Sequence, residues 1–112
     1  MSAEERFQNE TVRPIIKMQH DLLITHFQHY LKAKKYQLDD SADKKLVEFI
    51  TSSFQKDQQL RNTVQGLIIG HFTVDEYKQF ADIASETNKR IIQITKERIL
   101  NNRELFVDKT KY

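Results

Sequence analysis

Residues 72–106 carry the stretch FTVDEYKQFADIASETNKRIIQITKERILNNRELF, which decides the fold. Thr73 is followed three positions later by Glu76, and at this spacing each side chain can accept a hydrogen bond from the backbone N–H of the other residue. A helix is therefore expected to begin directly after Thr73. Because neither Gly nor Pro follows, we predict one long helix over 74–106, roughly 50 Å in length at about 1.5 Å per residue. The other segments then have to pack along this helix.

The composition of the chain favours an all-α fold. Of its 112 residues, 30% are charged and 38% are hydrophobic, and there are two Gly, one Pro and no Cys. So few turn-forming residues are unusual for an all-β protein. The absence of Cys excludes disulfides, thiolate metal sites and a Cys nucleophile. The length suits a single helical domain over residues 1–112, in which we expect 107–112 to be a frayed tail.

Hydrophobic spacing predicts four main helices in a bundle, preceded by a short N-terminal helical turn. The expected bounds of the main helices are about 12–35, 42–55, 58–70 and 74–106. Asp57 is expected to cap the third helix, although one bent helix over 42–70 fits the pattern as well. Ser2 and Glu5 form a second capping pattern, so residues 2–10 are either a separate turn or the bent start of the first helix.

Local signals mark the other expected helix ends. Thr11 is expected to cap the first helix, with Pro14 in its first turn, where the missing N–H costs little. The candidates for the cap of the second helix are Asp39, Asp40 and Ser41. Gly70 is expected to end the third helix. Gly66, four positions earlier, permits either a close contact between helices or an ordinary packing position.

The helix expected over 12–35 is apolar around most of its circumference. At 100° per residue its apolar side chains cover an arc of roughly 240°, whereas a surface helix needs only about 100°. These side chains are Ile15, Ile16, Met18, Leu22, Leu23, Ile24, Phe27, Tyr30 and Leu31. Such a helix has to be covered on more than one side, by several helices or by a second subunit. The 74–106 helix also exceeds its two short neighbours in length, and together these features predict self-association.

Polar residues occupy the expected apolar face of the 74–106 helix. Arg98 lies near the middle of that face, next to a seam of small or polar side chains at heptad spacing. The seam consists of Ala81, Asn88, Thr95 and Asn102. Polar groups on a buried face cost free energy unless they are paired. These residues are therefore expected either to find partners or to serve a function.

Three histidines of the first helix project among its apolar positions, so both long helices present polar side chains to the core. Three explanations stay open. In the first, the polar groups line a ligand pocket between helices. In the second, they form hydrogen bonds with one another or with water. In the third, the long helix extends beyond its neighbours, so that part of its face is solvated. The residues of the pocket would be His20, His26, His29, Asn88, Thr95 and Arg98.

Motifs for catalysis or metal binding are not recognised. His26 and His29 are three positions apart and can share one helical face, but zinc or iron needs three or four converging ligands. The inward Glu-x-x-His pairs of di-iron bundles are missing, as are a nucleophile elbow and a glycine-rich phosphate loop. We therefore predict no catalytic residue, no metal and no cofactor.

Charge and hydropathy limit the classes of partner. The net charge is +2, and acidic residues are interspersed among the basic ones of the last helix, so nucleic-acid binding is not expected. The apolar runs are too short to cross a membrane, and no secretory signal is recognised. A cytoplasmic location and no membrane partner are expected.

Two runs of the sequence are similar to a small family of uncharacterised bacterial helical proteins, some of which carry the label glyoxalase. The runs are Arg13-Pro-Ile-Ile-Lys-Met-Gln-His-Asp-Leu-Leu and Gly66-Leu-Ile-Ile-Gly-His-Phe-Thr-Val-Asp-Glu-Tyr. The resemblance covers most of the chain and implies an all-helical fold. It implies no catalytic residues. Metal-dependent glyoxalases resemble paired βαβββ modules with His and Glu ligands on strands, a pattern that this sequence does not show.

The leading hypothesis is a non-enzymatic helical interaction module that forms a homodimer or binds another protein. The alternative is a small-molecule or metal-binding protein, including an enzyme, with a polar pocket between its helices.

Overall fold

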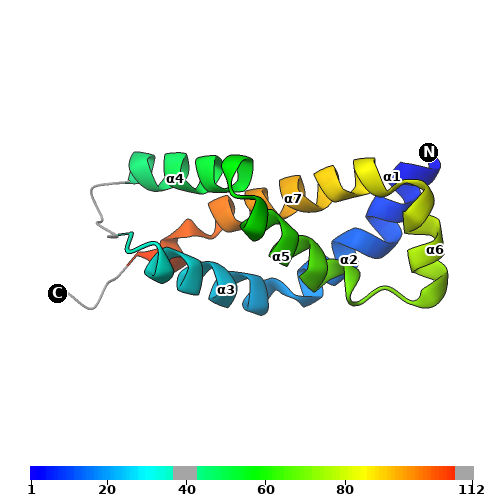
Figure 1. Cartoon of the computed structure of the whole chain (residues 1–112), viewed down its shortest axis with the longest axis horizontal. Helices are drawn as coiled ribbons and strands as arrows, with labels where there is room; N and C mark the ends of the chain where they lie inside the picture. Colours follow the sequence, from blue (N-terminus) through cyan, green and yellow to red (C-terminus); the bar gives the residue numbers. More distant parts are fainter. Residues whose placement is uncertain (37–42, 108–112) are drawn as a thin grey trace.

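The computed structural model describes residues 1–36 and 43–107, and every regular element in these two ranges is helical. The all-α prediction is thereby confirmed for the described residues. The molecule is elongated and measures 50 × 25 × 24 Å (Figure 1). The predicted caps at Asp39, Asp40 and Ser41 and the predicted frayed tail after Val107 lie outside the described residues.

The N-terminal segment forms one bent helix rather than a separate turn. It is built from α1 (Ala3–Phe7), a π-helical turn η1 (Gln8–Val12) and α2 (Arg13–Met18). Ser2 is its N-cap, because the Ser2 hydroxyl oxygen accepts a hydrogen bond from the backbone N–H of Glu5 at 3.1 Å. The predicted capping pattern of Ser2 and Glu5 is therefore confirmed for the Ser2 side chain.

Thr11 does not cap a new helix, and this prediction is wrong. Thr11 is buried within the π turn, and the backbone of Val12 is α-helical. Pro14 lacks an N–H, and its ring crowds the carbonyl four residues earlier, which weakens an α-helix at this point. The wider π turn just before Pro14 lets the helix continue through it.

The predicted helix over 12–35 is interrupted at Gln19. This residue separates α2 from α3 (His20–Ala33) and has φ −91° and ψ 13°. Neither Gly nor Pro lies at the break. The side-chain amide of Gln19 instead contacts the ring of His71, which lies between two later helices. The bend therefore coincides with a tertiary contact that periodicity does not reveal.

Two helices, and not one bent helix, occupy the middle of the chain. They are α4 (Asp43–Lys56) and α5 (Gln58–Ile69). Asp57 between them has an extended backbone, and its Oδ1 accepts a hydrogen bond from the N–H of Leu60 at 3.1 Å. The predicted cap at Asp57 is confirmed. Gly70 follows the last residue of α5, as predicted, but its φ of −60° lies in the ordinary right-handed region.

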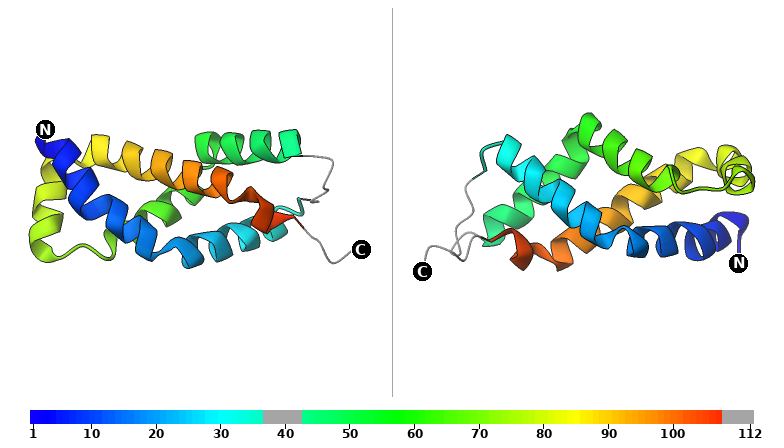
Figure 2. Two further views of the ribbon diagram at one scale, coloured as in Figure 1. Left: turned by 180° about the vertical axis from the view of Figure 1, so that it is seen from behind. Right: turned by 90° about the horizontal axis from the view of Figure 1, so that it is seen from below.

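The predicted unbroken helix over 74–106 is wrong. It is divided at Ile83 into α6 (Val74–Asp82) and α7 (Ala84–Asn101), and a 3-10 turn η3 (Arg103–Phe106) follows. Ile83 has φ −130° and ψ 27°, so α6 turns away and lies across one end of the molecule (Figures 1 and 2). This turn allows Phe80 to pack against Phe72, with ring centroids 5.4 Å apart.

The start of this region is as predicted. The N–H of Glu76 donates to the hydroxyl of Thr73 at 3.1 Å, and the N–H of Thr73 donates to Glu76 Oε1 at 2.8 Å. Both halves of the capping box are therefore present.

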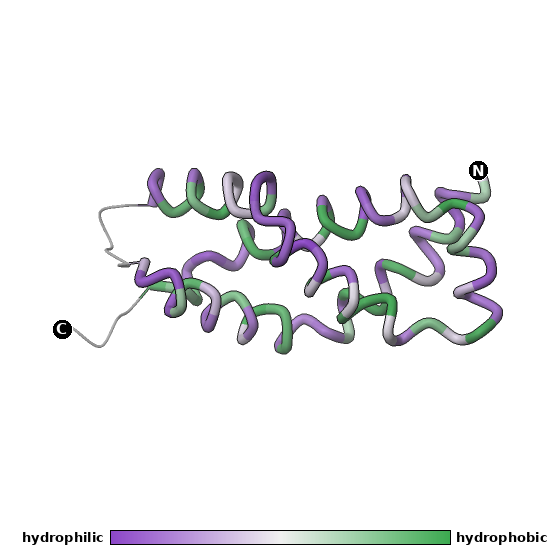
Figure 3. The backbone as a smooth tube through the Cα atoms, in the orientation of Figure 1, coloured by the Kyte–Doolittle hydropathy of each residue, from purple (hydrophilic) through white to green (hydrophobic). Residues whose placement is uncertain are grey.

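The centre of the fold is α7, which packs against α3, α4, α5, α6 and η1. Hydrophobic and hydrophilic residues alternate along each helix, as expected for helices with one buried face (Figure 3). The largest side chains that are almost fully buried come from several helices. They include Ile16, Leu23, Phe27, Leu31, Ile50, Ile68, Ile91 and Ile99.

Candidate functional site

Of the four seam residues predicted for the last long helix, only the middle two, Asn88 and Thr95, lie on the inner face of α7. Thr95 is 1% exposed, and neither its hydroxyl nor the side-chain oxygen of half-buried Asn88 has a hydrogen-bond partner in the described part of the chain. Asn102 is half-buried and donates from Nδ2 to the carbonyl of Arg98 at 2.7 Å. Ala81 is exposed on α6. The four residues therefore do not form one continuous network.

Thr87 is a buried polar residue that the sequence analysis missed. It is 0% exposed, and its hydroxyl is also without a partner among the described residues. Thr87 lies two turns before Thr95 on α7, and this i, i+8 relation is the signal that could have identified it. Two unpaired hydroxyls in the core cost stability, on the order of 1–3 kcal/mol each.

His20 and Arg98 are brought together, as the pocket hypothesis requires. Arg98 Nη1 and His20 Nδ1 are 3.2 Å apart, and Arg98 Nε is buried without a partner in the described part. This contact joins α3 to α7. Because the guanidinium only donates, Nδ1 of the His20 ring has to be the acceptor in this contact.

A polar groove of about 280 Å³ lies beside Arg98. Its lining residues are Arg13, Ile94, Glu97, Arg98, Asn101 and Asn102. Two arginines suggest an anion site, but Glu97 opposes them. The groove also lies at the carbonyl end of α7, where the helix dipole disfavours an anion. The groove is thus a weak candidate for a ligand site.

His26 lies elsewhere, in a groove of about 260 Å³ between α3 and α5. This groove shares no lining residue with the groove beside Arg98. Burial lowers the pKa of the His26 imidazole, and nearby His29 lowers it further. His26 is therefore neutral at neutral pH and can donate or accept one hydrogen bond.

The same groove contains a contact between Tyr30 and Asp57. The hydroxyl of Tyr30 donates to Asp57 Oδ2 at 2.7 Å, and Lys34 Nζ lies 3.7 Å from the same oxygen. The Tyr30 hydrogen bond and the backbone N–H of Leu60 hold the pKa of the Asp57 carboxyl below its usual range. Burial chiefly raises the pKa of Tyr30. This carboxylate is saturated by partners that join α3 to the start of α5, which makes it a structural link.

The six predicted pocket residues therefore lie in separate places. His20 and Arg98 meet, Asn88 and Thr95 lie within α7 next to the core, His26 faces α5, and His29 is exposed. Within the described ranges, no group of three or more His, Asp and Glu side chains is arranged to hold a metal ion.

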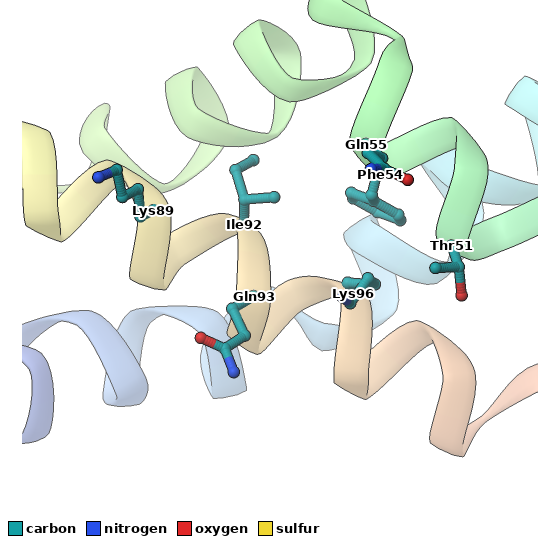
Figure 4. A pocket seen from close by; sticks show the side chains of 7 residues that line it. All are labelled: Thr51, Phe54, Gln55, Lys89, Ile92, Gln93 and Lys96. Atoms are coloured by element: carbon teal, nitrogen blue, oxygen red, sulfur yellow. The ribbon is translucent and has the colours of Figure 1, made fainter.

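A larger groove lies between α4 and α7, and we call it the α4–α7 groove (Figure 4). Its volume is about 470 Å³. Its lining residues are Thr51, Phe54, Gln55, Lys89, Ile92, Gln93 and Lys96. Of its two apolar lining residues, Phe54 is buried, at 3% exposed, and Ile92 is half-buried. Lys89 and Lys96 lie on either side of Ile92 along α7. Both lysines are among the basic residues of the last helix, whose sequence predicts a surface of mixed charge.

An apolar patch is exposed where α2 meets α3, and we call Met18 and Leu22, with Lys17 and Asp21 beside them, the junction patch. Met18 is 61% exposed and Leu22 is 44% exposed. The remaining apolar positions of the predicted arc are buried or half-buried. The arc that the sequence showed is thus covered within the chain, except at these two side chains.

The comparisons with known proteins supply no further constraint. No family model, curated protein or solved structure matches this chain. The resemblance to a bacterial helical family therefore stays a prediction. No helix in the described ranges combines the length and the apolar character needed to cross a membrane.

Proposed function

We propose that this protein is a non-enzymatic helical interaction module that self-associates through the junction patch. The observation that carries the proposal is the exposure of Met18 and Leu22, two large apolar side chains one helical turn apart. Met18 ends α2 and Leu22 lies in α3, so the two residues flank the bend at Gln19 within the segment whose apolar arc exceeds what a surface helix needs. Burying both against a second copy would remove apolar surface from water, at about 25 cal/mol per Å².

The charges beside the patch support pairing with a second copy. When two copies of one helix pack antiparallel around a two-fold axis, residues equidistant from the axis face each other. An axis at position 20 places Met18 against Leu22 of the second copy and leaves Lys17 two positions, about 3 Å along the helix, from its Asp21, a distance that a lysine side chain spans. Both charged side chains are exposed. Opposite charges therefore meet at both edges of the contact, which favours association.

The distribution of polar residues supports the non-enzymatic part of the proposal. General acid–base or nucleophilic chemistry needs side chains that converge within hydrogen-bond reach of one reacting atom. Of the predicted pocket residues, only His20 and Arg98 make a direct contact, and His26 faces a different groove. Asp57, whose carboxylate pKa is lowered, is engaged by Tyr30 and Leu60.

Light scattering during size-exclusion chromatography tests self-association. We expect a mass that approaches twice the 13.4 kDa of one chain as the concentration is raised. The variant Leu22→Lys should remain at the mass of one chain, since it places a charge in the apolar contact. Circular dichroism will show whether the variant keeps its helices. A wild-type protein that stays at 13.4 kDa at every concentration contradicts the proposal.

A charge exchange provides the matched control. Lys17→Asp alone places two acidic residues at each edge of the dimer and should weaken association. Lys17→Asp combined with Asp21→Lys restores opposite charges and should recover it. If the double variant is as weak as the single one, the two-fold arrangement is wrong.

A further inference from the structure

The α4–α7 groove exists because α7 continues past the end of α4. From Lys56 the chain turns into α5, so the half of α7 nearer to α6 has no part of α4 above it (Figure 1). Phe54, in the last turn of α4, and Ile92, in the middle of α7, line the resulting step (Figure 4). Ile92 is only half-buried there.

The groove combines an apolar centre with a cationic rim. Phe54 and Ile92 are its apolar lining residues, and Thr51, Gln55 and Gln93 are uncharged. Among the residues that the structure describes, Lys89 and Lys96 are its only charged lining residues, and no carboxylate lines it. The two lysines are seven positions apart, which places them on one face of α7, about 10 Å apart along its axis.

Lys89 is available for a partner. It lies 3.5 Å from Glu86 one turn earlier, but both side chains are more than 60% exposed, at 71% and 64%. An exposed pair of this kind contributes little, typically under about 1 kcal/mol. A carboxylate of another protein can therefore compete for the ammonium group without breaking a structural contact.

We propose that the α4–α7 groove binds an acidic amphipathic helix of a different protein. Apolar side chains at i, i+4 and i+7 of that helix would pack on half-buried Ile92, above the buried ring of Phe54, and two carboxylates about two turns apart would pair with Lys89 and Lys96. This proposal goes beyond self-association, because it assigns a second surface to a partner of another chemistry.

A second copy of this chain is a poor occupant of the same groove. A two-fold axis between Ile92 and Gln93 places Lys89 opposite Lys96 of the other copy. Two ammonium groups would then face each other at each edge, which disfavours the contact. The junction patch shows the reverse relation, with Lys17 near Asp21. The charges therefore favour a second copy at the junction patch and disfavour one at the α4–α7 groove.

Other recognition modes fit the groove less well. Addition of an extended peptide needs an exposed sheet edge, and residues 1–36 and 43–107 contain no strand. A polyproline segment needs a groove lined by several aromatic rings, and within residues 1–36 and 43–107 Phe54 is the single aromatic residue that lines this one. Nucleic acid favours a continuous cationic surface with little apolar contact, whereas the acidic Glu86 and Glu97 lie on α7 near the two lysines.

A synthetic helical peptide provides the probe. It consists of alanine and glutamine, with leucines at i, i+4 and i+7 and two glutamates seven positions apart on the flank of the leucine stripe. A second peptide carries lysines in place of the two glutamates. Binding is measured by fluorescence anisotropy, and its location by ¹⁵N–¹H chemical-shift changes. We expect the acidic peptide to bind at least tenfold more tightly than the basic one and to shift the amides of Ile92, Gln93 and Gln55.

Charge reversal on the protein tests the assigned rim. The variant Lys89→Glu with Lys96→Glu should lose at least tenfold in affinity for the acidic peptide and gain affinity for the basic one. The matched control, Lys44→Glu with Lys78→Glu, changes the net charge equally at two exposed positions outside the groove and should bind as the wild type does. Circular dichroism confirms that both variants are folded.

Two results would overturn the proposal. One is equal affinity for the two peptides, or shift changes that lie outside the groove. The other is binding of single-stranded oligonucleotide that depends on Lys89 and Lys96 and exceeds peptide binding, which would assign the rim to phosphates.

Peptide binding by the α4–α7 groove and self-association through the junction patch can be tested independently. Leu22→Lys should abolish self-association and leave peptide affinity unchanged, and the Lys89/Lys96 reversal should do the opposite. A peptide that competes with self-association would show that the two surfaces are one, and this would also contradict the proposal.

Discussion

The two ends of the molecule are held together in different ways. At the end formed by α3, α4, α5 and η3, which we call the bundle end, one ring contacts three others. Phe27 lies 5.3 Å from Tyr30, 5.8 Å from Phe54 and 5.3 Å from Phe106. At the end crossed by α6, which we call the α6 end, the rings form a single row. Phe72 there lies 5.4 Å from both Phe7 and Phe80.

Polar contacts increase the difference. The bundle end is also linked by Tyr30 to Asp57 and by Arg103, whose guanidinium donates to both carboxylate oxygens of Asp43 at 2.7 and 3.2 Å. In α6, Phe80 is the only buried residue, and Tyr77 is 52% exposed. Segments with few buried contacts open at lower free energy than the rest of a protein. The α6 end is therefore expected to open while the bundle end remains folded.

Removal of one ring from each end tests this comparison most strongly. Phe27→Ala should lower the free energy of unfolding by about 3–5 kcal/mol, because it leaves a cavity among three rings. Phe80→Ala should release α6 and change global unfolding much less. Urea denaturation measures the first effect, and amide hydrogen exchange of α6 measures the second. Equal losses of global stability would show that the ends unfold as one unit.

The link at Asp57 makes the bundle end sensitive to acid. Its carboxyl pKa is lowered in the folded protein, chiefly by the hydrogen bond from Tyr30. The ionised group therefore stabilises the fold above the unfolded value of about 3.8, and this contribution is lost as the pH falls below it toward the folded value. Asp57→Asn should cost about 1–2 kcal/mol at neutral pH, since it removes a hydrogen bond to a charged group. Urea denaturation at a series of pH values measures both.

The variant and the wild type should begin to converge in stability as the pH falls below about 4, and convergence is complete only below the lowered pKa of folded Asp57, where the carboxyl is protonated in both the folded and the unfolded chain. Asp43 is the control, because Arg103 lowers the pKa of its carboxyl as well. Asp43→Asn should show the same sign of pH dependence. A constant difference between wild type and Asp57→Asn at every pH would mean that Asp57 acts only through its shape.

The helix starts could be predicted from sequence because capping is local. Thr73 with Glu76, Asp57 with Leu60, and Ser2 all make the hydrogen bonds that their spacing predicts. Each bond spans three residues, so no knowledge of the rest of the fold is needed.

The two helix breaks could not be predicted, because they coincide with tertiary contacts that the local sequence does not reveal. Gln19 and Ile83 are compatible with a helix, and neither is next to Gly or Pro. Gln19 meets His71 from 52 residues away. The turn at Ile83 brings Phe80 into the row of rings that begins at Phe7. Periodicity shows which face of a helix is apolar, but it does not show where a distant neighbour bends it.

The candidate sites were predicted only in part, for a related reason. Periodicity placed Thr95 on a buried face, and Thr95 is buried. His20 and His26 both project among the apolar positions of the predicted 12–35 helix. Periodicity therefore could not show that His20 would meet Arg98 while His26 would face α5. The α4–α7 groove depends on where α4 ends relative to α7. That offset is a property of packing between helices and not of either sequence segment.

The smallest expected effects concern backbone conformation at Lys35, Gly66 and Gly70. At the bundle end, Lys35 has φ 56°, and the N–H groups of Lys35 and Tyr36 donate to the carbonyls of Lys32 and Leu31. This is a Schellman motif, in which Gly is preferred because a side chain is strained at positive φ. Lys35→Gly should raise the free energy of unfolding by about 0.5–1 kcal/mol, after the greater freedom of Gly in the unfolded chain is subtracted. Thermal denaturation measures the gain.

Neither of the two glycines of the chain has a positive φ, so neither position requires the conformational freedom of Gly. Gly66 is in the exposed part of α5, where an added Cβ meets nothing within 4 Å, so Gly66→Ala should raise stability by up to about 1 kcal/mol. At Gly70 the same atom would lie 3.0 Å from the carbonyl oxygen of Gly66, and Gly70→Ala should bring no comparable gain. If Gly66→Ala stabilises the chain but weakens self-association, α5 belongs to the contact between copies, and the interface extends beyond the junction patch. If Gly66→Ala stabilises the chain and leaves self-association unchanged, Gly66 makes no contact between copies and the junction patch alone governs association.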